Sequence, residues 1–172
     1  MALREIIVLP DPRLRKATQT VTVFDAALKT LTDDMLETMY DAPGIGLAAP
    51  QIGVMKRIFV MDCTSREDRS EPRAFINPEL TWQSETLETS EEGCLSIPDV
   101  YEQVTRPERV RLRWQDLDGS VREEEFADRP AVCVQHELDH LDGRLFIDHL
   151  SSLKRTLITN RMKKLARGRA RG

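Results

Sequence analysis

The sequence predicts an α+β fold, with small antiparallel or mixed sheets packed around a central helix and a further helix at the C-terminal end. Three observations predict it. Short apolar segments separated by turn residues fill most of the first two thirds of the chain. A helical segment containing His136-Glu137-Leu138-Asp139-His140 follows them. The length of 172 residues suits one domain with its own apolar core.

The elements are expected in the following order. Residues 4–9 (REIIVL) are β-branched and apolar, which predicts a strand. Apolar residues at helical spacing predict a helix from Asp25 to Tyr40 that ends at Ala42-Pro43-Gly44. Residues 57–62 (RIFVMD) predict a strand, and the polar residues 64–73 predict a loop. Further strands are expected at residues 74–80, 84–92, 109–117 and 121–126, with a hairpin turn at Asp118-Gly119.

Two helices are expected after these strands. The helix with the two histidines should begin near residues 128–130, where Pro130 suits a first turn, and end at Gly143. A final helix should run from about Leu150 to Leu165. Its apolar residues form a stripe along one face, which indicates a helix that docks on the core. The stripe consists of Leu150, Leu153, Leu157, Ile158, Met162 and Leu165.

Bulk composition excludes several classes of protein. No run of 18 apolar residues is present, so we expect no membrane span and no membrane partner. The N-terminal apolar run has only four residues and is not typical of a secretory leader, which favours a cytoplasmic protein. The three cysteines, Cys63, Cys94 and Cys133, cannot all pair and form no visible disulfide framework.

The segment His136 to His140 predicts part of a metal site. Residues four apart lie on one face of a helix, so both imidazoles can reach one ion. Glu137 projects beside them, where it can contact a metal-bound water as a general base. The alternative is a pair of surface histidines, but the apolar residues around them favour a buried helix.

The third ligand is not supplied by the usual downstream patterns. The position that would carry the third histidine of a metzincin is Phe146, and no glutamate follows Glu137. Asp148 and His149 remain candidates, although nothing singles them out. Cys94 is a better one, because a thiolate binds zinc or ferrous iron strongly and would leave one position open for water.

A glycine-rich stretch, residues 43–53 (PGIGLAAPQIG), allows several interpretations. A phosphate-binding loop is only weakly indicated. Such a loop should follow a strand and open a helix, whereas this stretch follows a predicted helix and contains Pro50. A loop whose backbone approaches a ligand, with Gln51 as a polar donor, and a plain turn between helix and strand are equally compatible with the sequence.

Taken in order, GIGLAAPQ, EGCLS and HELDH resemble the three signature motifs of the peptide deformylase family. VLPDPRLR near the start and the segment CVQHELDHLDGRLFIDHLS are also similar to that family. The resemblance covers nearly the whole chain. It implies hydrolysis of the N-formyl group from the initiator methionine of nascent polypeptides, with Glu137 passing a proton from water to the leaving amine.

The resemblance also implies roles for individual residues. Cys94, His136 and His140 match the metal ligands, and Glu137 matches the general acid/base. Further implied roles are oxyanion stabilisation by Gln51 and the N–H of Leu95, the methionine pocket at Ile45, Val132 and Cys133, substrate-backbone contacts at Gly46 and Gly93, and an Arg106 that anchors Glu92. Tyr101 and Arg129 depart from the residues common in relatives, which leaves side-chain preference open.

The metal and the competing functions remain open at this stage. The ligand types allow Zn²⁺, Fe²⁺, Co²⁺ or Ni²⁺, and the resemblance favours Fe²⁺ in the cell. One rival is a small metallopeptidase. Another is an RNA- or ribosome-binding module with a structural metal, which would need a fourth protein ligand such as Asp148 or His149.

The charge distribution sets the C-terminal segment apart. Residues 151–172 have eight Lys or Arg and no acidic residue, while residues 1–150 carry 17 basic against 29 acidic side chains. We expect residues 1–149 to form the catalytic part and residues 150–172 an amphipathic helix and basic tail of the same domain. Such a tail can attract RNA phosphate, so the ribosome is an expected partner of a protein that we expect to be a monomer.

Overall fold

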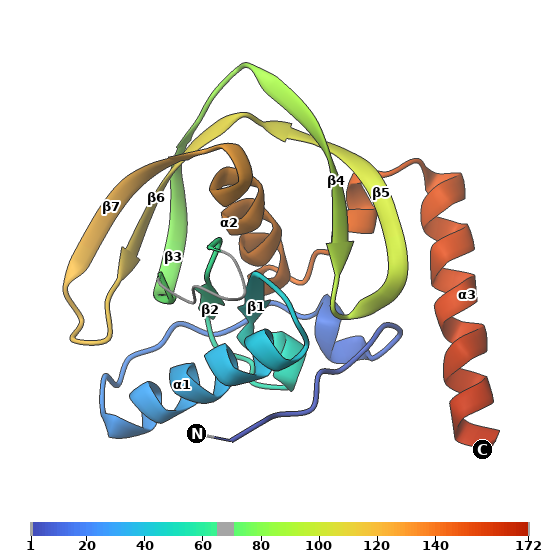
Figure 1. Cartoon of the computed structure of the whole chain (residues 1–172), viewed down its shortest axis with the longest axis horizontal. Coiled ribbons are helices and arrows are strands. Elements are labelled where there is room, and N and C mark those ends of the chain that lie inside the picture. Colours follow the sequence, from blue (N-terminus) through green and yellow to red (C-terminus); the bar gives the residue numbers. More distant parts are fainter. Residues whose placement is uncertain (1, 65–70, 172) are drawn as a thin grey trace.

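The computed structural model describes residues 2–64 and 71–171, and Figure 1 shows the arrangement of the chain. One sheet has the strand order β1-β2-β3-β6-β7, and β4 and β5 form a second sheet; neighbouring strands in both are antiparallel. The strands are β1 Gly46–Ala48, β2 Ile58–Met61, β3 Arg73–Gln83, β4 Leu87–Cys94, β5 Ile97–Pro107, β6 Arg109–Gln115 and β7 Val121–Ala127. The helices are α1 Ala26–Asp41, α2 Asp128–Leu141 and α3 Ser152–Arg171, with short 3-10 helices η1 Pro12–Arg15, η2 Ala49–Ile52 and η3 Phe146–His149.

Helix α2 lies between the larger sheet and the β4–β5 pair (Figure 1). Ala131, Val134 and Leu141 recur at helical spacing and are buried in the same apolar cluster as the sheet. The chain turns away at Gly143, whose φ is +73°. A Cβ there would lie 2.6 Å from the carbonyl oxygen of Arg15, so both the backbone angle and the space require glycine.

Packed aromatic rings make the sheet surface that contacts α2 rigid. Phe59 and Phe75 stack with ring centroids 4.5 Å apart, and Trp114 lies 4.8 Å from Phe75. Phe126 from β7 closes the group at 6.1 Å from Phe75. All four rings are buried, so the helix rests on a surface that has little freedom to move.

The β4–β5 pair presents the end of β4 to α2. The register of the pair shifts between Gly93 and Cys94, where β4 reaches the turn into β5. Below it, Ile97, Val104 and Phe146 share a second apolar cluster with residues of the C-terminal helix. This cluster fixes the hairpin independently of the larger sheet.

Helix α3 runs six residues beyond the predicted end at Leu165, to Arg171. Ile158 and Met162 are buried in the second cluster. Leu153 and Leu157 are 68% and 61% exposed, so only part of the predicted stripe docks on the core. In Figure 1 the helix runs along one side of the molecule beyond β5, which explains why one face stays open.

Most predicted elements are confirmed, with bounds shifted by a few residues, and three predictions need correction. The predicted strand at residues 4–9 is wrong, because this segment makes isolated hydrogen bonds instead of pairing with a strand. Its Ile7 N–H donates to the Gln51 carbonyl and its Leu9 N–H to the Ser96 carbonyl, while Arg4 N–H donates to the side chain of Thr38. The glycine-rich stretch at residues 43–53 is not a plain turn between helix and strand, because residues 46–48 form β1 and residues 49–52 form η2. Strand β5 was not predicted from the sequence.

Three further expectations concern membrane spans, disulfides and the loop after residue 63. Among the described residues no helix is long and apolar enough to span a membrane. All three cysteines are free thiols, in line with the predicted absence of a disulfide framework. The predicted loop at residues 64–73 falls largely outside the described residues, which omit 65–70.

Candidate metal centre

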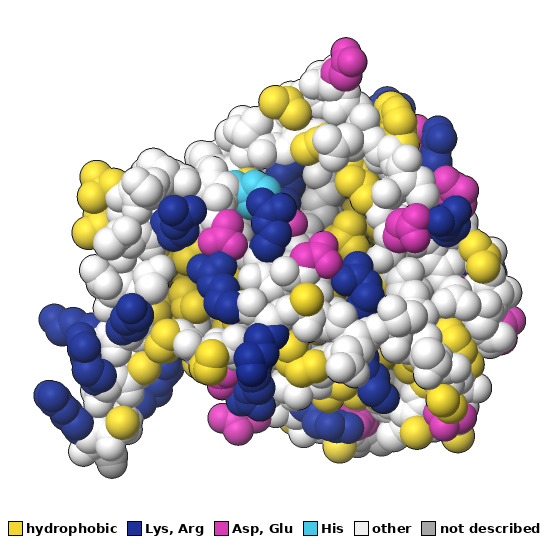
Figure 2. Space-filling model, turned by 180° about the vertical axis from the view of Figure 1, so that it is seen from behind, with side chains coloured by type: hydrophobic (Ala, Val, Ile, Leu, Met, Phe, Trp, Pro, Cys, Tyr) yellow, Lys and Arg dark blue, Asp and Glu magenta, His cyan; other side chains and the backbone are white. Residues whose placement is uncertain are grey.

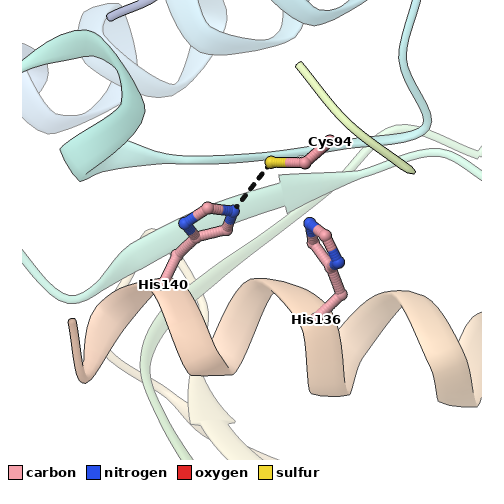
Figure 3. Close-up of side chains that lie close together, drawn as sticks. All are labelled: Cys94, His136 and His140. Atoms are coloured by element: carbon pink, nitrogen blue, oxygen red, sulfur yellow. Dashed lines mark hydrogen bonds between the residues drawn. The ribbon is translucent and has the colours of Figure 1, made fainter. Parts of the chain in front are cut away.

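Cys94, His136 and His140 come together from two elements. Cys94 ends β4, and the histidines lie one turn apart on α2. One ligand atom from each residue lies within 4.8 Å of the others. Figure 3 shows both imidazoles projecting from one face of the helix toward the sulfur, which is 3.3 Å from His140 Nε2. Cys94 and His136 are 42 residues apart in the sequence, and the packing of the β4–β5 hairpin against α2 brings them together.

The ring of His136 is held by a buried ion pair. Its Nδ1 lies 3.0 Å from Oε1 of Glu92, which leaves Nε2 facing the other two residues. Arg106 donates two hydrogen bonds to Glu92, from Nε at 2.6 Å and Nη2 at 2.9 Å, as the predicted anchor should. Burial would raise the pKa of Glu92, but His136 and Arg106 hold it below its usual value. A carboxylate in this position fixes both the tautomer and the orientation of an imidazole ligand.

Glu137 is buried beside this group with a perturbed acidity. Burial raises the pKa of its carboxyl to about 7. Its Oε2 has no hydrogen-bond partner among the described residues. Gly46 of β1 faces the same carboxyl, since a Cβ at Gly46 would lie 2.8 Å from Oε1. A carboxyl that titrates near neutral pH is suited to accept and return a proton.

Gln51 reaches the same point from η2. Its Oε1 accepts the N–H of Ala48 at 2.9 Å, which fixes the orientation of the amide. Its Nε2 therefore faces Ser96 and Cys94, 3.1 Å from Oγ of Ser96 and 3.6 Å from Sγ of Cys94. Ser96 is fully buried and was not singled out from the sequence, where a serine two residues after the cysteine gave no clear signal.

A single pocket joins these groups. It has a volume of about 850 Å³ and contains the predicted site residues Gln51, Glu92, Cys94, Leu95, His136 and Glu137 in its wall. The five residues expected to contact substrate also line it, namely Ile45, Gly46, Gly93, Val132 and Cys133. Tyr101 and Arg129, the two departures from the family pattern, are both exposed and lie on the same pocket.

The alternative third ligands are engaged elsewhere. Asp148 pairs with Arg15 at 2.6 Å, and His149 lies 2.9 Å from Asp139. Among the described residues, the group formed by Cys94, His136 and His140 is the one cluster of three side chains that could hold an ion. Asp139 also contacts Arg106 at 3.0 Å, a contact that its place inside HELDH does not reveal.

The chemistry of this group fits a divalent cation. One thiol and two imidazoles are donors that Zn²⁺ and Fe²⁺ accept, and three protein ligands leave room for water. Burial and the neighbouring His136 lower the pKa of His140, so its imidazole is neutral and free to ligate. Burial would also lower the pKa of His136, but Cys94 and Glu92 raise it well above its usual value. A cation bound here would displace the proton that the raised pKa of His136 favours.

Comparison with known proteins gives consistent matches. The family model for polypeptide deformylase matches residues 3–156. The chain is 50% identical to the peptide deformylase of Novosphingobium aromaticivorans, covering 96% of this chain and 98% of that one. It is 53% identical to the peptide deformylase of Phenylobacterium zucineum, covering 97% and 99%.

Solved structures agree in fold. The crystal structure of a peptide deformylase from Legionella pneumophila matches with a TM-score of 0.90 at 44% identity, covering 99% of both chains. A peptide deformylase from Synechococcus elongatus, solved in complex with actinonin, matches with a TM-score of 0.85 at 38% identity, covering 95% of this chain and 87% of that one. The chain therefore belongs to the peptide deformylase family of metal-dependent hydrolases.

Proposed function

We propose that this enzyme removes the N-formyl group from the initiator formyl-methionine of nascent polypeptides and releases formate. The observation that carries the proposal is the convergence of Cys94, His136 and His140 beside the buried carboxyl of Glu137, in a pocket large enough for a methionine side chain. Cys94, His136 and His140 would hold one divalent cation. When bound, that cation supplies Lewis acidity and lowers the pKa of water.

The residues around the cation would then perform the hydrolysis. Glu137 accepts a proton from the attacking water and returns it to the leaving amine, a role for which a pKa of about 7 is suited. The amide of Gln51 and the N–H of Leu95 donate hydrogen bonds to the oxyanion of the tetrahedral intermediate. One such donor is worth about 3–4 kcal/mol of transition-state stabilisation. Gln51 is ready to donate because its Oε1 is already occupied by Ala48.

Substrate contacts follow from the pocket lining. Ile45, Val132 and Cys133 provide apolar surface for the methionine side chain. Gly46 and Gly93, which both line the pocket, are proposed to lie along the substrate backbone.

The metal in the cell is proposed to be Fe²⁺, with Zn²⁺, Ni²⁺ and Co²⁺ as alternatives that the same donors accept. Metal analysis after purification under anaerobic conditions tests this choice. Iron near one equivalent supports it, and zinc near one equivalent with no iron contradicts it.

Formate release from a formyl-methionyl peptide, with and without a chelator, tests the function. Chelator-sensitive formate release supports it. Cleavage inside an unformylated peptide would instead indicate a metallopeptidase, and metal binding with no hydrolysis would indicate a structural metal in a binding module.

Two variants test the assigned residues. Glu137→Ala should retain metal and lose activity by about two to four orders of magnitude, because general acid–base catalysis contributes that much. Cys94→Ala should lose the metal. Cys63→Ala is the matched control for metal content: this cysteine follows β2 and does not line the pocket, so its removal should leave the bound metal unchanged. Activity is not its readout, because the Cys63 thiol contacts Cys133 of the proposed methionine pocket. A metallated, active Cys94→Ala would refute the ligand assignment.

The remaining proposals concern the whole protein. We infer that residues 1–149 and 150–172 form one catalytic domain, supported by the burial of Ile158 and Met162 of α3. Figure 2 shows Lys and Arg side chains gathered on the C-terminal helix, which supports an approach to ribosomal RNA. We also propose that the protein is a cytoplasmic monomer. Deleting residues 166–172 should weaken co-sedimentation with ribosomes at low salt, and unchanged co-sedimentation would rule out a role for the tail.

A further inference from the structure

A continuous chain of polar side chains leads from the metal centre to the protein surface. It begins at Nδ1 of His136, passes through Glu92 to Arg106, and continues from Nη1 of Arg106 to Oδ2 of Asp139 at 3.0 Å. The same Oδ2 lies 2.9 Å from Nε2 of His149, which is also 3.4 Å from Arg106 Nη1. Every link is a direct contact, and the end of the chain is the one histidine outside the metal centre.

The two carboxylates of this chain need hydrogen-bond donors beyond the single guanidinium of Arg106. Glu92 and Arg106 are 4% and 5% exposed at their side chains, and Asp139 is 17% exposed. Two carboxylates therefore share one guanidinium in a poorly hydrated place, which is costly unless further donors satisfy them. His149 supplies such a donor, and a quarter of its side chain remains exposed to solvent.

The position of the Arg106 guanidinium depends on its contacts with Glu92 on one edge and with Asp139 on the other. Its Nε and Nη2 donate to Glu92, while Nη1 donates to Asp139, whose Oδ2 also lies 2.9 Å from Nε2 of His149. The guanidinium is planar and rigid, so releasing one edge lets the whole group rotate. Rotation would loosen Glu92, and through it the ring of His136.

We propose that Asp139 and His149 are positioning residues for the metal centre, which act by holding Arg106 and hence the imidazole of His136 in place. The inference rests on the proposed metal site and deepens it. It also gives η3 a role, because the segment that carries His149 leads directly into the C-terminal helix. A change in that segment would reach the metal through four contacts.

The test measures metal release, which does not require turnover. Protein loaded with Ni²⁺ is mixed with excess EDTA, and the rate of metal loss is followed for wild type, His149→Ala, His149→Gln and Asp139→Asn. The glutamine amide nitrogen can replace Nε2 as a donor to Asp139. Lys154→Ala is the control, since it removes an exposed ion pair with Glu102 that lies outside the chain of contacts.

His149→Ala and Asp139→Asn should speed metal loss by about tenfold, the lower end of what outer-sphere partners of metal ligands contribute. His149→Gln should recover most of the wild-type rate, Lys154→Ala should match wild type, and KM for a formyl-methionyl peptide should change less than twofold. Unchanged release in His149→Ala, or equal release from the alanine and glutamine variants, overturns the proposal. If wild type holds Ni²⁺ but releases no formate, the proposed function fails while the release rates still decide this inference; a wild type that binds no Ni²⁺ overturns both.

Discussion

The buried carboxyl of Glu137 predicts a pH-dependent cost in the metal-free protein. Burial raises the pKa of this group to about 7 from its usual 4.5, with no partner for Oε2 among the described residues. Replacing it by glutamine in Glu137→Gln keeps the shape of the side chain but removes the titrating proton. The variant should therefore be more stable than wild type at alkaline pH, by an amount that the pKa difference sets.

The sign and size follow from proton linkage. The folded state binds the proton more tightly than the unfolded state, so ionisation penalises the fold as the pH rises from 4.5 through 7. At about 1.4 kcal/mol per pKa unit, the full penalty is roughly 3 kcal/mol above pH 8. It is absent below pH 4.5, where both states are protonated. Between pH 5 and pH 8 the stability difference between variant and wild type should grow by about 2 kcal/mol or slightly more.

Urea unfolding of both metal-free proteins at pH 5 and pH 8, in the presence of a reductant, measures this difference. Comparing the two proteins at each pH cancels the contribution of titrating groups that do not interact with Glu137. A stability difference that stays constant to within about 0.5 kcal/mol would show that Glu137 does not carry the penalty, and would remove the basis for its proposed role as a base near neutral pH.

Three other substitutions test the packing that the structure describes. Gly46→Ala places a Cβ 2.8 Å from Oε1 of Glu137 and 2.9 Å from Sγ of Cys133, so kcat/KM should fall at least about tenfold, measured by formate release. Gly168→Ala is its counterpart, because nothing lies within 4 Å of that position; thermal unfolding should show unchanged or slightly raised stability. Met162→Ala removes a fully buried side chain and should cost about 2–5 kcal/mol in urea unfolding, whereas a loss below about 1 kcal/mol would show that α3 is loosely docked.

Local patterns carried the sequence-based prediction a long way. The spacing of His136 and His140 placed two imidazoles on one helix face. In the structure the two rings are in contact, with centroids 5.1 Å apart. Periodicity also predicted α1 and α2 to within a few residues. It wrongly predicted a strand at residues 4–9. An apolar run can pack against the core and make isolated hydrogen bonds without pairing with a strand.

The sequence by itself determined the family, through three motifs in order, and the local geometry of each motif. Only the tertiary structure decided how the motifs meet: the register shift after Gly93 directs Cys94 toward α2, and β1 brings Gly46 against Glu137. The links from Arg106 to Asp139 and His149 are of the same kind. Spacing along one helix fixes neighbours because the helix repeats, but contacts between elements depend on how their apolar faces pack, which no local pattern specifies.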